Sequence, residues 1–149
     1  MHDEILPMEQ RGAQALFSLA QQARMHAVCP YSGYAVGAAL LDETGRVWLG
    51  ANIENSAYSP TICAERVALA KAVFDGARHF VMIAVAGGNL SSSGLTPGDI
   101  QDCTPCGVCR QALSEFFAPQ TLFVFMVGGQ LQMRRMDQIL PDAFVSDMI

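Results

Sequence analysis

Apolar residues in the first third of the chain recur with two different periods. Between residues 9 and 27 the spacings are three and four, which is typical of an amphipathic helix, and the Cys29-Pro30 pair is expected to end it. Residues 36–41 and 46–51 are apolar runs separated by a short, turn-rich segment, 42–45, of hairpin length. This part of the chain therefore predicts a helix followed by a β-hairpin.

The rest of the chain alternates between helix and strand patterns. A helix is expected over residues 62–77, with Cys63, Val67, Ala70, Val73 and Phe74 on one face. The remaining predicted elements are a strand over 80–86, a Gly-, Ser- and Pro-rich loop over 87–104, a helix over 105–117, strands over 122–127 and 131–135, and a short helix over 136–140.

This alternation determines the expected fold class. The predicted strands 80–86 and 122–127 are apolar throughout, as in a sheet that is covered on both faces. We therefore predict an α/β fold with three layers, α/β/α, and a mixed sheet of roughly five strands. The sequence shows no internal repeat and no domain boundary, so residues 1–149 are expected to form one domain.

Composition and charge restrict the partners. The net charge is −5, and the nine Lys and Arg residues form no cluster, so no nucleic-acid partner is expected. No apolar run approaches the roughly 18 residues that span a bilayer, and the first ten residues do not resemble a signal peptide. We expect no membrane partner and a cytoplasmic location. The mean hydropathy of +0.25 suggests that other subunits cover some apolar surface.

The cysteines carry the candidate chemistry. There are five, an odd number in a chain without an export signal, which favours metal binding or thiol chemistry over disulfides. Cys106 and Cys109 are three residues apart at a helix start and can reach one ion, and Cys63 can supply a third ligand. Three thiolates favour zinc and leave a fourth position for water. A bare CxxC also fits a redox pair or half of a structural zinc site.

Charged residues beside these cysteines extend the hypothesis. Glu65 follows Cys63 by two residues, so it can face a water on the metal and carry its proton to a substrate. A His or Cys, then Glu two residues on, then PCxxC is the established signature of zinc deaminases. Two helix N-termini, with Arg66 and Arg110, are expected to offset the charge of three thiolates. For Arg110 a solvated surface position is an equal alternative.

Four segments bring these residues into a familiar order. CPYSGYAVGAALL, GANIENSAY, CAERVALAKAV and PCGVCRQAL, between residues 29 and 113, resemble the homotetrameric cytidine deaminase family, with a looser echo at residues 139–144. The resemblance implies a zinc-dependent hydrolase that converts cytidine or deoxycytidine into uridine or deoxyuridine and ammonia, in pyrimidine salvage. It also implies one Zn²⁺ per chain, a small nucleoside as substrate and a homotetramer.

The resemblance assigns roles to single residues. It makes Cys63, Cys106 and Cys109 the zinc ligands, Glu65 the general acid and base, and Arg66 a hydrogen-bond donor to the ligating thiolates. It makes Asn52 and Glu54 the pair that holds the ribose 3′-hydroxyl, the amide of Ala64 the group that binds the pyrimidine carbonyl oxygen, and Phe144 an aromatic residue that reaches a neighbouring subunit's site.

Two departures from the family pattern concern substrate choice. Tyr34 replaces a phenylalanine that stacks near the base, and its hydroxyl needs a partner if it is buried. The loop over 87–104 is longer than usual, and its Asp99 and Asp102 are expected to face solvent, with Cys103 a spare thiol. Three alternatives stay open: a deaminase of another aminated nucleoside, nucleobase or nucleoside antibiotic, a non-catalytic zinc-stabilised protein, and a thiol redox protein.

Overall fold

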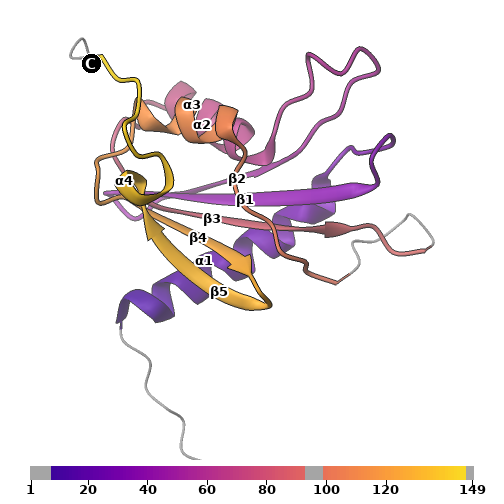
Figure 1. Cartoon of the computed structure of the whole chain (residues 1–149), viewed down its shortest axis with the longest axis horizontal. Coiled ribbons are helices and arrows are strands. Elements are labelled where there is room, and N and C mark those ends of the chain that lie inside the picture. The colour runs from indigo at the N-terminus through magenta and orange to yellow at the C-terminus, as the bar shows by residue number, and fades with distance from the viewer. Residues whose placement is uncertain (1–7, 93–98, 147–149) are drawn as a thin grey trace, which may run out of the picture.

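A computed structural model describes residues 8–92 and 99–146, with side chains from residue 12 onward (Figure 1). The first ten residues, used above to argue against a signal peptide, lie mostly outside the described residues, as do positions 93–98 of the predicted loop. The elements are α1 (Met8–Ala23), the 3₁₀ helix η1 (Arg24–His26), β1 (Tyr34–Asp42), β2 (Val47–Ala51), α2 (Ala64–Phe74), β3 (Phe80–Asn89), α3 (Gly107–Ser114), β4 (Leu122–Val127), β5 (Gln130–Arg135) and α4 (Met136–Ile139).

The strands form the mixed five-stranded sheet that the sequence predicts. Their order is β2-β1-β3-β4-β5, and only the β3–β4 pair is parallel. Tight turns at residues 43–46 and 128–129 join the antiparallel pairs β1–β2 and β4–β5, whereas the parallel pair β3–β4 needs the crossover that contains α3. The expected fold class is confirmed.

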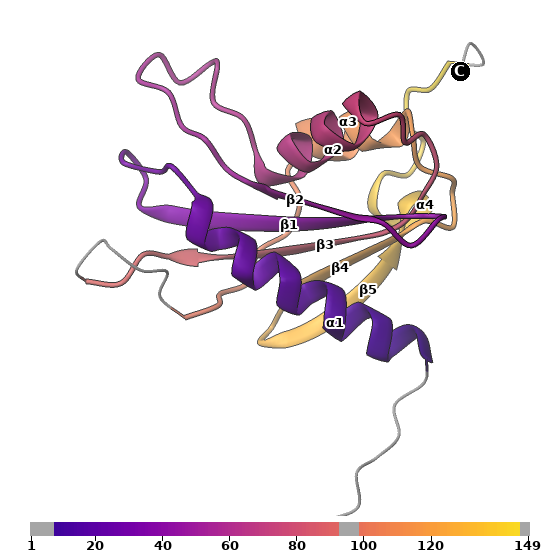
Figure 2. The ribbon, with the colours of Figure 1, turned by 180° about the vertical axis from the view of Figure 1, so that it is seen from behind.

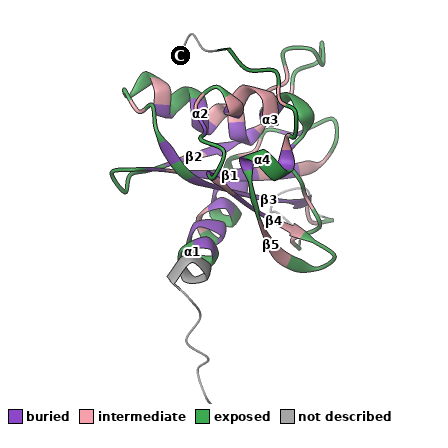
Figure 3. Ribbon diagram, turned by 60° about the vertical axis from the view of Figure 1, so that its left-hand side comes forward, coloured by how far each residue is buried: buried purple, intermediate pink, exposed green. Residues whose placement is uncertain are grey.

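Helices cover both faces of the sheet. Helix α1 packs across one face, and α2, α3 and α4 pack against the other, which gives three layers (Figures 1 and 2). Successive residues of β3 alternate between the two cores, because strand side chains point to opposite faces: Ile83 and Val85 face α2, whereas Met82 and Ala84 face α1. This two-sided burial explains the uninterrupted apolar run (Figure 3).

The predicted packed face of α2 was only partly right: Val73 packs against the core, but two other members of the face do not. The buried positions of the helix include Ala64, Ala68 and Ala72, whereas Ala70 is exposed and 91% of Phe74 is accessible. Small side chains let the helix lie close to β2: a Cβ added at Gly50 would clash with the carbonyl oxygen of Ala64. Close backbone contact, together with the buried side chain of Leu69, therefore sets the position of this helix.

The segment predicted as a loop over 87–104 is partly paired. Strand β3 continues to Asn89, and Gln101 and Cys103 form single bridges to Gly87 and Met126. The ladder between β3 and β4 joins residues 82–84 to residues 122–124. Beyond it, residues 101 and 103 contact both strands. We call residues 99–104 the return arm.

Within the described part of the chain, no helix combines the length and the apolar character needed to cross a membrane.

Candidate active site

Three thiols from two helix starts lie together. Cys63 is the N-cap of α2, Cys106 is the N-cap of α3, and Cys109 lies in the first turn of α3. Their sulfur atoms all lie within 4.8 Å of one another, and Sγ of Cys63 is 3.8 Å from Sγ of Cys106. Two sulfurs bound about 2.3 Å from one tetrahedral zinc ion would be about 3.8 Å apart. The donor set and its spacing therefore fit zinc.

The surroundings of the sulfurs favour negative charge. Both helices begin at the thiol group, so the positive ends of two helix dipoles lie beside it. The backbone N–H of Cys109 donates to Sγ of Cys106 at 3.4 Å. Hydrogen bonding from Cys109, together with Arg66, lowers the pKa of Cys63. These contacts stabilise the thiolate of Cys63, the form that binds metal.

Arg66 directs its guanidinium toward this group. Its Nη2 donates to Sγ of Cys63 at 3.6 Å, and its buried Nε has no hydrogen-bond partner among the described residues. Hydrogen bonding to Cys63 raises the pKa of Arg66, which therefore stays charged. The geometry agrees with the role that the resemblance gives Arg66.

Arg110 has a different role from the one expected. Its Nε donates to the carbonyl of Pro105 and its Nη1 to the carbonyl of Ile139, each at 2.8 Å. Its recorded hydrogen bonds thus go to backbone carbonyls, and it is only partly exposed. Arg110 joins the segment before Cys106 to the end of α4, so neither sulfur donation nor a solvated surface position describes it.

Glu65 is a buried carboxyl beside the thiols. Only 3% of its surface is accessible, although it lies in the first turn of α2. Burial, and after it the charge of nearby Cys63, raises the pKa of the Glu65 carboxyl to about 7. A buried carboxyl two residues from a metal ligand is placed to accept and release a proton.

The residues expected to hold the ribose follow directly after β2 and have backbone partners. Oδ1 of Asn52 accepts from the N–H of Val36, and its Nδ2 donates to the carbonyl of Tyr34, both at 2.9 Å. Oε1 of Glu54 accepts from the N–H groups of Tyr31 and Ser32 at 3.0 and 3.1 Å. Both side chains thus help to shape the chain around residues 31–36.

Burial raises the pKa of the Glu54 carboxyl, but hydrogen bonds from Ser32 and Tyr31 outweigh it and hold the pKa below its usual value. Glu54 is therefore ionised at neutral pH, as an acceptor for a hydroxyl group requires.

Three other predicted site residues lie in different surroundings. Ala64 is fully buried directly after Cys63. The hydroxyl of Tyr34 donates to the carbonyl of Asp102 at 3.2 Å, and burial raises its pKa to about 12. Phe144 is 85% exposed, and its carbonyl accepts from Nε2 of Gln111 at 2.8 Å. The ring of Phe144 is thus free to contact another molecule.

Sequence reasoning missed two polar residues near the site. Arg24 is buried, and its guanidinium donates to the carbonyls of Ala35 and Gly88, each at 2.9 Å. Asp102 is exposed, as expected, but its carboxylate also accepts from the N–H groups of Gly128 and Gly129 at 2.7 and 3.0 Å. The Gly128-Gly129 pair marks the turn, but no local pattern indicates that a distant aspartate caps it.

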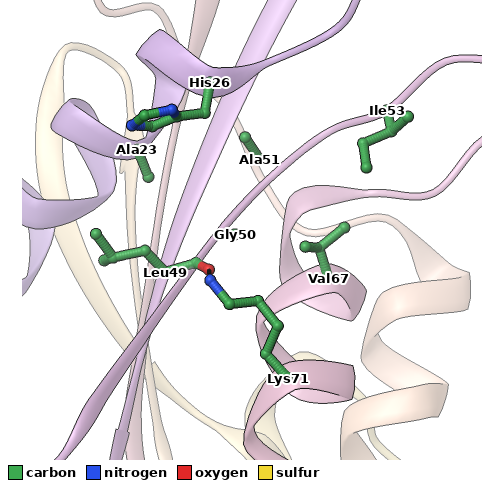
Figure 4. Close-up of a pocket in the computed structure, with 8 residues that line it drawn as sticks. All are labelled: Ala23, His26, Leu49, Gly50, Ala51, Ile53, Val67 and Lys71. Carbon is green, nitrogen blue, oxygen red and sulfur yellow. Dashed lines mark hydrogen bonds between the residues drawn. The ribbon is translucent and has the colours of Figure 1, made fainter.

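A hollow of about 370 Å³ lies beside the edge strand β2 (Figure 4). Ala23, Leu49, Ile53 and Val67 line it, and Nζ of Lys71 reaches the carbonyl of Leu49 across it. Its lining contains neither Glu65 nor a cysteine of the thiol group. We therefore base the function on the thiol group and not on this hollow.

The fold and the site together define a class of protein: an α/β protein whose zinc site is built from thiols at two helix starts beside a buried carboxyl. Residues 10–126 match the family model described as the cytidine and deoxycytidylate deaminase zinc-binding region.

Individual relatives agree with this match. A cytidine deaminase of Sporosarcina psychrophila is 41% identical over 132 residues, which cover 88% of this chain and 90% of the relative. One from Halalkalibacterium halodurans is 40% identical over 135 residues, with 90% and 95% covered. The crystal structure of the Burkholderia pseudomallei cytidine deaminase has a TM-score of 0.75 and 37% identity, with 88% of this chain and 98% of that chain covered.

The chain belongs to the zinc-binding cytidine and deoxycytidylate deaminase family. The resemblance of the four sequence segments is thereby confirmed, as are the predictions of an enzyme and of zinc as its cofactor.

Proposed function

We propose that this protein deaminates free cytidine and deoxycytidine, with Cys63, Cys106 and Cys109 as the ligands of one zinc ion per chain and Glu65 as the proton carrier. The observation that carries the proposal is the buried carboxyl of Glu65 beside three thiols whose spacing fits zinc. A structural zinc site has no need of a buried carboxyl next to the metal, because such sites are closed by four protein ligands.

The reaction consumes one water and releases one ammonia. When bound, the zinc ion activates a water molecule for attack on C4 of the pyrimidine. Glu65 takes a proton from that water and delivers it to N3, and a second delivery to the amino group lets ammonia leave. Uridine or deoxyuridine remains. Arg66 and the two helix N-termini stabilise the thiolates throughout.

Substrate recognition follows from the residues around the thiols. We assign the ribose 3′-hydroxyl to Asn52 and Glu54 and the pyrimidine carbonyl to the amide of Ala64. The ionised state of Glu54 supports this assignment. We assign the ring of Tyr34 to stacking near the base, while its hydroxyl donates to the carbonyl of Asp102.

We further propose one domain over residues 1–149, a homotetramer in the cytoplasm, and a role in pyrimidine salvage. Apolar side chains outside the core support assembly: Phe144 is 85% exposed, Tyr58 71% and Met25 63%. Exposed apolar groups that lie together are typical of surfaces that other subunits cover, and the ring centroids of the exposed Tyr31 and Tyr58 are 5.9 Å apart. Phe144 would then complete a neighbouring subunit's site.

The test is ultraviolet-monitored deamination of cytidine and deoxycytidine by the zinc-loaded protein, with Glu65→Gln as the matched control. We expect turnover by the wild type and a loss of about 10²- to 10⁴-fold in the variant with its zinc retained. A wild type that binds zinc but leaves both nucleosides unchanged would contradict the proposed substrate, and other aminated nucleosides and nucleobases would then be compared.

A further inference from the structure

Asp102 connects two parts of the molecule that are distant in sequence. Its carboxylate accepts from the N–H groups of Gly128 and Gly129, which form the β4–β5 turn with φ angles of 62° and 72°. Its carbonyl accepts from the hydroxyl of Tyr34 at the start of β1. The side chain of Asp102 thus attaches the return arm to the β4–β5 turn, and its backbone carbonyl attaches the arm to β1.

The neighbouring residues of the return arm are also fixed. The N–H of Gln101 donates to the carbonyl of Gly87 at 2.8 Å, and the N–H of Cys103 donates to the carbonyl of Met126 at 3.1 Å. The packing is tight, because a Cβ added at Gly87 would lie 2.6 Å from Sγ of Cys103. The arm is therefore built into the sheet between β3 and β4.

This fixed segment leads directly to the zinc ligands. Asp102 precedes Cys106 by four residues, and the intervening Pro105 is fully buried. With one end of this short connection attached to the sheet, the position of Cys106 depends on where Asp102 is held. Because α3 begins directly after Cys106, the same attachment affects the position of Cys109 in the first turn of that helix.

We propose that Asp102 and Tyr34 are positioning residues that hold Cys106 and Cys109 in the geometry for zinc, and that the Tyr34 hydroxyl does not select the substrate. This inference rests on the proposed function only in taking these cysteines as zinc ligands. Residues that orient metal ligands affect metal affinity by about 10- to 100-fold. The Tyr34 hydroxyl, which departs from the family pattern, thus holds the return arm in place and does not change the class of substrate.

The experiment measures the rate at which the zinc-loaded protein transfers zinc to a chromogenic chelator, well below the melting temperature of every variant. Asp102→Ala removes the bond to the turn, and Tyr34→Phe removes the bond to β1 while keeping the ring. We expect zinc release to accelerate about 10-fold in Asp102→Ala and less in Tyr34→Phe. Asp102→Asn, which keeps an acceptor oxygen, should fall between wild type and Asp102→Ala.

Two controls separate positioning from general stability. Asp42→Ala removes an aspartate that accepts two backbone N–H bonds in the β1–β2 turn, at the opposite end of β1. Asp99→Ala removes the same charge from an exposed position of the return arm. Both should release zinc at the wild-type rate, although Asp42→Ala lowers the melting temperature. Equal acceleration in Asp42→Ala, or none in Asp102→Ala, would overturn the proposal.

Kinetics give a second readout. For Asp102→Ala and Tyr34→Phe we expect kcat for cytidine to fall with KM nearly unchanged, because the zinc geometry changes while the nucleoside contacts remain. A raised KM with normal zinc release in Tyr34→Phe would assign its hydroxyl to the substrate instead. A wild type that does not deaminate cytidine would refute the proposed function, whereas the zinc-release comparison would still decide the role of Asp102.

Discussion

The side-chain oxygen of Asn52 accepts a hydrogen bond from the backbone N–H of Val36 at 2.9 Å. The same amide donates to the carbonyl of Tyr34, so one side chain joins the end of β2 to the start of β1. A residue proposed to hold the ribose therefore also stabilises the strand that carries Tyr34. The two roles are separable, because only one of them requires substrate.

Asn52→Ala is expected to destabilise the free protein as well as to weaken nucleoside binding. Two backbone groups lose their partners, which costs about 1–3 kcal/mol of unfolding free energy. Denaturation without nucleoside measures this effect. Asn55→Ala is the control, since Asn55 is exposed and its side-chain oxygen accepts from the N–H of Ala57 in a local turn. An unchanged stability with a raised KM would show that the Asn52 amide serves only the substrate.

Sequence patterns predicted the order and type of the elements because strong local signals coincide with tertiary packing. The run over 122–127 is β4 residue for residue, and the three cysteines were grouped from their positions at helix starts. The face of α2 was predicted only in part, because a contact with Gly50, which lies on β2, fixes the helix through alanines. Periodicity alone favours large apolar side chains and gives no weight to such a contact.

The site's supporting residues were the least predictable. Asp102 and Arg110 act on backbone groups that are close in space but distant in sequence. Their side chains have no local pattern that distinguishes them from solvated residues. Backbone carbonyls and N–H groups exist at almost every position, so the sequence does not indicate which of them a side chain will reach.

Arg110 is predicted to stabilise the segment that precedes Cys106. Arg110→Ala leaves the carbonyls of Pro105 and Ile139 without their charged donor, which should cost about 2–3 kcal/mol. Arg110→Lys should rescue little, because one ammonium group does not reproduce the fork of a guanidinium. Urea denaturation measures both variants.

Arg78→Ala is the matched control, because Arg78 also donates to two carbonyls, those of Val73 and Ala77, but is exposed. Its loss should cost less than about 1 kcal/mol. Similar costs for Arg78→Ala and Arg110→Ala would contradict the interpretation that burial gives the Arg110 bonds their importance.

Gly50→Ala is predicted to disturb the zinc site from outside it. The added methyl group would meet the carbonyl of Ala64 and the N–H of Ala68, so the start of α2 must move, and Cys63 with it. Overpacking of this kind costs about 1–3 kcal/mol. The zinc content and the melting temperature should both decrease.

Gly12→Ala tests the same chemical change where space is open. Gly12 lies within α1 with no atom near an added Cβ, so alanine should stabilise the helix by about 0.5–1 kcal/mol. If both variants lost stability equally, close approach at Gly50 would not be the cause.

Asp42 is predicted to make the unfolding free energy of the protein depend on pH in the acidic range. Burial raises the pKa of its carboxyl, but bonds from the Thr44 hydroxyl and from the N–H groups of Arg46 and Thr44 hold it below its usual value. A carboxyl with a lowered pKa in the folded state stabilises the protein above its unfolded pKa of about 3.9. That contribution is lost as the pH falls through the lower, folded pKa.

The comparison of wild type with Asp42→Asn isolates this effect, because asparagine keeps an acceptor oxygen but no charge. At pH 6–7 the wild type should be more stable by about 1 kcal/mol, the usual size of such a hydrogen-bond contribution, and the difference should shrink below about pH 4. Thermal denaturation across this range measures it. A difference that stays constant from pH 7 to pH 3 would mean that shape, and not the carboxylate charge, holds the β1–β2 turn.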